Sequence, residues 1–180
     1  MEFLTTNSPA LIVAIPLVAA FILPLIGRAG DRVRNTFTLT VYALIAFLVA
    51  VLAVNVHSIG IRIYTFGATA ADLAVPQHFI VPVRIIFEVD AMSMFMGIIV
   101  TVVTLAALIY SWHFLKGQTG QARFYSLMML LYAAMMGLAF TGDMFNLFVF
   151  LEIASIAGAA LAAYRTNLAD AVEGDRKSVV

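Results

Sequence analysis

Glu152 is the side chain in this sequence that points most plainly to chemistry. It lies inside Asp143–Arg165, an apolar run that holds no other acidic or basic residue between its charged ends. At about 1.5 Å of helical rise per residue, this run can cross a hydrocarbon layer of roughly 30 Å, with Glu152 near the middle. A carboxylate at that depth costs several kcal/mol unless it is paired, hydrated or protonated. We therefore predict that Glu152 belongs to a proton or cation path.

Two interpretations of Glu152 remain open at this point. In the first, the carboxyl group relays protons or cations and a neighbouring charge tunes it. In the second, it stays protonated and hydrogen-bonds across a helix interface. Ser155 lies one helical turn away on the same face and could bond the carboxyl group or a water molecule. No Lys or Arg lies inside an apolar span, so either the counter-charge lies on another polypeptide or Glu152 is neutral and structural.

Four further polar residues near the ends of apolar runs are candidates for a role. His113 closes the third run, where a near-neutral histidine could pass protons or could simply reach to water. Asn146 lies one turn inside the fifth run and could hold a water molecule or stabilise the turn. Asp143 and Asp90 each stand directly before an apolar run, and we expect both to be helix N-caps.

The composition indicates an integral membrane protein. Of 180 residues, 63% are hydrophobic and 11% are charged, against about 45–50% and about 25% in soluble domains. The lack of cysteine excludes disulfides, iron–sulfur ligation and thiol catalysis. The three histidines are scattered and the net charge is zero, so neither a metal site nor nucleic acid is expected. We predict no catalytic residue and no cofactor in this chain.

The apolar runs predict an all-α membrane fold with a small β element. The expected spans cover residues 10–27, 36–57, 92–114, 124–140 and 143–165. Residues 58–90 are too polar to cross a membrane, but Ile61–Phe66 alternates and Val81–Val89 is rich in β-branched residues. These two stretches predict a pair of short strands, as in a hairpin. Residues 166–180 are expected to form a polar tail.

The basic residues predict how the chain is oriented. With five spans, most of them fall on one side of the membrane and two on the other. The first group is Arg28, Arg32, Arg34, Lys116, Arg123, Arg165, Arg176 and Lys177, and the second is Arg62 and Arg84. The positive-inside rule then places the N-terminus and the strand pair outside the cell membrane and the tail in the cytoplasm.

Two segments resemble the antiporter-like subunit family. The sequence TGDMFNLFVFLEIASIAGAALAAYR, Thr141–Arg165, is similar to the fifth-helix region of that family. VDAMSMFM, Val89–Met96, resembles the entry to its third helix, and the strand pair resembles its external hairpin. The family includes large Mrp cation/proton antiporter subunits and the antiporter-like subunits of respiratory complex I and membrane-bound hydrogenases. The resemblance covers essentially the whole chain and corresponds to the N-terminal part of such a subunit.

The resemblance implies a role for Glu152 and for partners. In this family the fifth-helix glutamate pairs with a lysine of the seventh helix during proton translocation. We expect that lysine on another membrane subunit of a large hetero-oligomeric complex, with any redox step also on partners. The leading hypothesis is a subunit of an Mrp-type Na⁺/H⁺ antiporter module or of a complex I-like or membrane-bound hydrogenase complex. The alternative is a structural or assembly subunit without a transport role.

Overall fold

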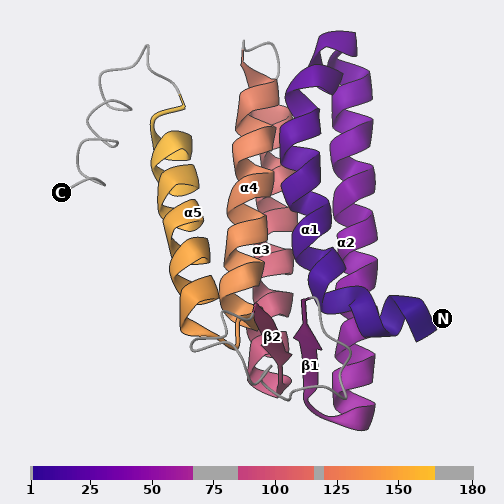
Figure 1. The fold of residues 1–180 in the computed structure, drawn as a ribbon. Helices are drawn as coiled ribbons and strands as arrows, with labels where there is room; N and C mark the ends of the chain where they lie inside the picture. Colours follow the sequence, from indigo (N-terminus) through magenta and orange to yellow (C-terminus); the bar gives the residue numbers. More distant parts are fainter. Residues whose placement is uncertain (1, 67–84, 116–119, 165–180) are drawn as a thin grey trace.

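The computed structural model describes residues 2–66, 85–115 and 120–164. Within these ranges the chain forms long helices that run side by side and one small sheet at one end of the bundle (Figure 1). The elements are α1 (Glu2–Ile26), the 3₁₀ turn η1 (Gly27–Ala29), α2 (Asp31–Ile59), β1 (Arg62–Thr65), β2 (Ile86–Val89), α3 (Ala91–Phe114), α4 (Gln121–Phe140) and α5 (Met144–Ala162). The predicted tail at residues 166–180 lies outside the described residues.

Five helices of the described part are long and apolar enough to cross a membrane, which agrees with the predicted number of spans. Their ends differ from the prediction at the start of α1, which is Glu2 and not residue 10, and at the first connection. The residues before Thr36 are predicted to be a polar break, but α2 already begins at Asp31 and only a short 3₁₀ turn and Gly30 precede it. Gly30 makes the change of direction with φ of 119°, a backbone conformation that glycine adopts without steric cost. Asp31 then lies in the first turn of α2, where a negative charge is favourable.

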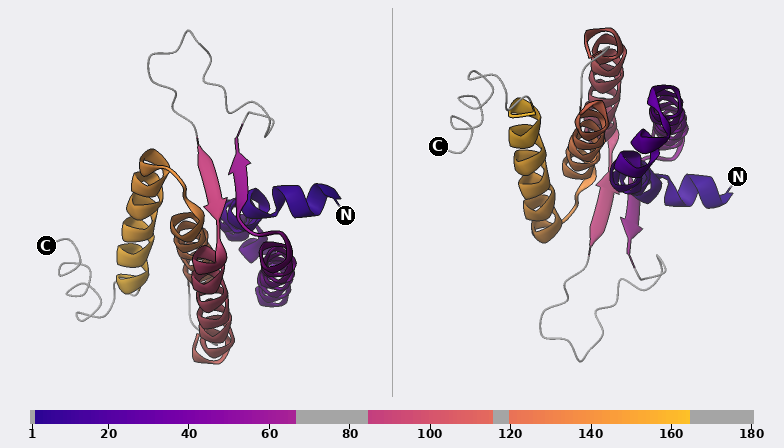
Figure 2. Two further views of the ribbon diagram at one scale, coloured as in Figure 1. Left: turned by 90° about the horizontal axis from the view of Figure 1, so that it is seen from below. Right: turned by 90° about the horizontal axis from the view of Figure 1, so that it is seen from above.

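Helix α4 is the central helix of the bundle. It packs most extensively against α1 and α5, and also against α3. Half of its most apolar stretch is buried inside the chain, against 17% for α5. Figure 2 shows α5 at one edge of the bundle and α2 at the other, with α4 and α3 between them. The innermost side chains of the core include Leu23, Ile45, Leu52, Met129, Met136 and Phe140.

The two strands pair as predicted. β1 and β2 are antiparallel, with Arg62 opposite Val89 and Thr65 opposite Ile86. They lie where α2 ends and α3 begins, and we call this end of the bundle the sheet face. The other end, where α2 begins and α3 ends, is the opposite face. The segment that joins the strands lies outside the described residues, and the placement of the sheet face outside the cell stays a prediction.

The turn between α4 and α5 is bonded to β2. The backbone N–H of Gly142 donates to the carbonyl oxygen of Ile86 at 2.8 Å, and Phe87 and Thr141 form an isolated antiparallel bridge. Asp143 accepts from the backbone N–H of Ile86 through Oδ2 at 2.9 Å. Its Oδ1 accepts from the backbone N–H of Asn146 at 2.7 Å. Asp143 therefore caps α5, as predicted, and also holds β2 in place.

Asp90 is the second predicted N-cap that the structure confirms. Its Oδ1 accepts from the backbone N–H of Ser93 at 2.7 Å, at the start of α3. The same hydrogen bond, together with one from the Ser93 side chain, holds the pKa of Asp90 below its ordinary value. The carboxylate form is favoured because the charged oxygen is the better acceptor.

A glycine of α4 permits the close packing of α5. A Cβ atom on Gly137 would lie 2.5 Å from ring carbons of Phe150, so the ring occupies the space that any larger residue would need. The small residues Ala154, Gly158 and Ala162 of α5 form the kind of surface on which helices often pack closely. A Cβ atom on Gly158 would meet nothing within 4 Å, so this small surface makes no close helix contact within the described chain.

Candidate functional site

Glu152 lies on the exposed side of α5. The helix is fixed at its start by the Asp143 cap and along one side by α4, which leaves its remaining surface uncovered. Next to Glu152 on that surface are Phe148, which is 67% exposed, and Leu151, which is 52% exposed. Among the described residues, no basic group lies within ion-pair distance of Glu152. The carboxyl group therefore stands in an apolar, uncovered helix face.

Ser155 and Asn146, the two other candidates on α5, have different surroundings. Ser155 is exposed, and its hydroxyl group donates to the carbonyl oxygen of Leu151 at 2.9 Å, within its own helix. Asn146 is only 5% exposed, and its side-chain Nδ2 is buried without a hydrogen-bond partner among the described residues. The backbone of Asn146, not its side chain, makes the capping contact with Asp143.

His113 is not part of the same site as Glu152. It lies in the last turn of α3 and lines a groove between α2 and α3 on the opposite face. Glu152 lies on α5, at the other edge of the bundle (Figure 2). The structure therefore separates the predicted site residues into two places, α5 and the α2–α3 groove.

Arg34 is a polar centre that sequence reasoning missed, because it was counted only as one of the orienting charges. Its side chain is buried, with 4% exposure. Nη1 donates to Asp31 Oδ1 at 2.8 Å, and Nη2 donates to Gln121 Oε1 at 2.5 Å and to Asn35 Oδ1 at 3.0 Å. Nε also donates to Asn35, at 3.1 Å. The guanidinium group lies over the ring of Tyr125, 5.5 Å from its centroid.

This network joins three helices at the opposite face. Gln121, the first residue of α4, accepts from Arg34 of α2 and donates through Nε2 to the carbonyl oxygen of Leu115, just after α3, at 2.6 Å. Such a buried cation is tolerated because most of its N–H groups are hydrogen-bonded and an acidic residue is adjacent. The available signal was local: Asp31 and Asn35 stand three residues before and one residue after Arg34.

A carboxyl group such as that of Glu152 on an apolar helix can bind a proton or pair with a cation. No three residues of the types His, Cys, Asp and Glu gather as a metal site within residues 2–66, 85–115 and 120–164. The membrane-length helices and the carboxyl group on α5 define the class: a multi-pass membrane protein with one acidic group midway along a spanning helix.

Comparison with known proteins shows which membrane proteins this chain is similar to. The profile of the family described as NADH-ubiquinone oxidoreductase (complex I), chain 5 N-terminus, matches residues 80–125. NADH-quinone oxidoreductase subunit N of Desulforudis audaxviator is 33% identical over 98% of this chain, which covers 32% of that protein. A Na⁺/H⁺ antiporter subunit of Alkalihalophilus pseudofirmus is 29% identical over 61% of this chain and 22% of that protein.

A solved structure has the same fold. It is a chain of the membrane-bound sulfane sulfur reductase, an archaeal respiratory membrane complex, and superposes with a TM-score of 0.76 and 26% identity. The match covers 95% of this chain and 33% of that chain. These comparisons confirm that the chain resembles the N-terminal part of an antiporter-like membrane subunit. It spans about a third of the length of the first of these relatives.

Proposed function

We propose that this chain is a transmembrane subunit of a multi-subunit ion-translocating complex, of the Mrp antiporter type or the complex I-like type. In this proposal Glu152 contributes to a proton or cation path that other polypeptide segments complete. The observation that carries the proposal is the position of Glu152 on an uncovered, otherwise apolar side of α5. The relatives are named as an NADH-quinone oxidoreductase subunit and as subunits of Na⁺/H⁺ and K⁺/H⁺ antiporters.

The argument starts from the cost of that position. Glu152 lies between Phe148 and Ser155 on a helix of membrane-spanning length, and an ionised carboxylate against lipid would cost several kcal/mol. The cost is removed if a partner covers this side of α5 and brings a basic group or water to the carboxyl group. A lysine is the counter-charge we propose, because its pKa shifts readily on burial and it can exchange a proton with a carboxylate.

The orientation that we propose for the chain in the membrane follows from the charge distribution. We propose that the opposite face, with Arg28, Arg32, Arg34 and Arg123, is cytoplasmic and that the sheet face is outside. Protons or cations would then pass between the two faces along α5 and its partner. The partner is another membrane subunit of the same complex, and the ion is H⁺ or Na⁺.

The test replaces Glu152 by Gln in the assembled complex in inverted membrane vesicles. Ion translocation should fall to background while the complex assembles to its normal level, because Gln keeps the shape but holds no exchangeable proton. Glu152→Asp should retain part of the activity. Glu88→Gln is the matched control, since Glu88 is an exposed glutamate of β2 outside the spans, and it should transport normally. Full translocation by Glu152→Gln would reject the proposed relay.

A structural or assembly subunit is the second candidate. The observation in its favour is the breadth of exposed apolar surface on α3 and α5, which includes Met92, Phe95, Val102, Phe148 and Ile156. This candidate predicts that Glu152→Gln transports normally. It also predicts that Gly158→Leu reduces the recovery of partner subunits, because Gly158 faces open space within the chain.

A further inference from the structure

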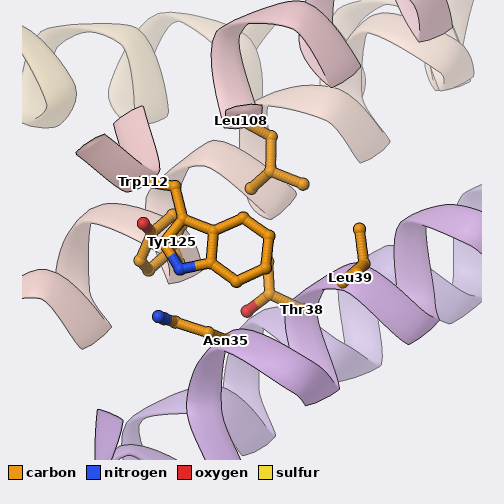
Figure 3. A pocket seen from close by; sticks show the side chains of 6 residues that line it. All are labelled: Asn35, Thr38, Leu39, Leu108, Trp112 and Tyr125. Carbon is orange, nitrogen blue, oxygen red and sulfur yellow. The ribbon is translucent and has the colours of Figure 1, made fainter. Parts of the chain in front are cut away.

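The groove between α2 and α3 on the opposite face has the properties of a lipid headgroup site. It encloses about 400 Å³, and its walls include Asp31, Arg34, Trp112 and His113. A narrow continuation is lined by Thr38, Leu39, Leu108 and Tyr125, and it shares Asn35 and Trp112 with the larger part. Figure 3 shows the side chains of the narrow part converging from α2, α3 and α4. None of these residues belongs to the ion path proposed above along α5.

The polarity of the groove changes along its length. Polar and charged residues lie at the first turn of α2 and the last turn of α3, where a membrane meets water, and apolar residues follow deeper in the span. Leu39 is 40% exposed and Ile109 is 57% exposed, so apolar surface flanks the groove. Trp112, a residue type that favours the membrane interface, lies at the transition. Such a gradient matches an amphipathic molecule with a polar head and hydrocarbon chains.

The charges of the groove match a zwitterion. Arg34 is held rigidly by Asn35, Asp31 and Gln121, and the second N–H of its Nη1 makes no hydrogen bond among the described residues. The indole nitrogen of Trp112 is turned toward Asn35 (Figure 3). These donors suit a phosphate group. The side chain of Asp31 is 75% exposed beside them, and its second carboxylate oxygen, which accepts no hydrogen bond from the described residues, suits a primary ammonium group.

We propose that this groove binds a phospholipid with a zwitterionic, primary-amine headgroup, that is, a phosphatidylethanolamine. Its phosphate lies against Arg34 and Trp112, and its ammonium group donates hydrogen bonds to Asp31. Phosphatidylglycerol carries a neutral glycerol beyond its phosphate, so it brings no positive charge to Asp31. A choline headgroup carries the positive charge but has no N–H with which to bond the carboxylate.

The experiment measures lipid retention on the purified protein by native mass spectrometry. The protein is titrated with dioleoyl phosphatidylethanolamine, phosphatidylglycerol or phosphatidylcholine, which differ only in the headgroup. We expect phosphatidylethanolamine to bind about tenfold more tightly than either of the others, as one charge-assisted hydrogen bond would give. Asp31→Asn should remove the preference over phosphatidylcholine, since the amide is uncharged but still accepts a hydrogen bond from Arg34.

Two further variants keep the proposal testable. Trp112→Phe removes the indole N–H but keeps an aromatic ring, and should weaken the binding of all three lipids. Asp90→Asn makes the same chemical change as Asp31→Asn on the sheet face and should leave the preference intact. Equal retention of the three lipids by the unaltered protein, stronger retention of phosphatidylglycerol, or an unchanged preference in Asp31→Asn would each overturn the proposal.

Discussion

Asp143 accepts two hydrogen bonds, and these two contacts predict how much stability is lost when Asp143 is replaced. One carboxylate oxygen accepts from Asn146 and caps α5, and the other accepts from Ile86 and fixes β2. Asp143→Asn leaves a single acceptor oxygen for two N–H donors and turns an amide N–H₂ toward one of them. Asp143→Ala leaves no acceptor at all. The two variants should therefore lose stability to different extents, but in both of them the loss arises at the start of α5 and at β2.

The expected decrease in the free energy of unfolding is the sum of the contributions of these two contacts. Loss of a helix N-cap costs about 1 kcal/mol, and loss of a hydrogen bond to a charged group costs about 1.5–3 kcal/mol. Asp143→Ala should thus lower the free energy of unfolding by about 2.5–4 kcal/mol. Asp143→Asn should lower it by about 1.5–3 kcal/mol, because one of the two contacts survives.

The assay is unfolding of the protein in mixed micelles, followed through the fluorescence of its one tryptophan, together with amide hydrogen exchange. In both variants the amide of Ile86 should exchange faster. The matched control is Asp90→Asn, because Asp90 uses a single oxygen to cap α3 and an amide can replace it. If Asp143→Asn is no less stable than Asp90→Asn, or if exchange at Ile86 is unchanged, the double role assigned to Asp143 is wrong.

Three more predictions concern packing, a buried hydroxyl group and pH. Gly137→Ala should lower the free energy of unfolding by about 1–3 kcal/mol through overpacking, and Phe150→Leu in the same chain should restore part of the loss, measured by unfolding of the single and double variants. Tyr42→Phe should be neutral or stabilising, because its hydroxyl group is buried without a hydrogen-bond partner among the described residues. Tyr132→Phe should instead cost about 1 kcal/mol, because it loses a 2.9 Å hydrogen bond to a threonine of α3; an equal effect of the two would contradict this. Asp90 has a lowered pKa, so its stabilising contribution is present above the pKa of the unfolded chain and is lost as the pH falls through the folded value. A carboxyl-carbon NMR titration of Asp90 should have its midpoint below that of an ordinary aspartate.

The sequence predicted well those features that depend on neighbouring residues. Composition alone decides that a run such as 92–114 crosses a membrane, and α3 was found at Ala91–Phe114. An aspartate directly before an apolar run needs only its own helix to act as a cap, which explains why Asp90 and Asp143 were identified. The alternation at Ile61–Phe66 likewise indicated β1 before any partner strand was known.

The features that sequence reasoning missed depend on residues far apart in the chain. Arg34 is buried where Gln121, which is 87 positions away, lies against it, and its local neighbours Asp31 and Asn35 do not by themselves distinguish it from a solvated arginine. The small residues around Gly158 favoured a close contact, but α5 turns Phe150 toward Gly137 instead. Which side of a uniformly apolar helix faces its neighbour cannot be read from the helix itself, since nearly every position is compatible with burial.

The central position of α4 has a consequence for the biogenesis of the protein. Among the membrane-length helices of the described part, α4 has both the lowest hydropathy and the largest buried share. A translocon releases each nascent helix into lipid according to its hydrophobicity, so α4 gains the least from entering the bilayer alone. Its most extensive partner, α1, is synthesised first. We expect α4 to enter the lipid phase together with α1 rather than unaided, so that damage to α1 would leave α4 outside the membrane.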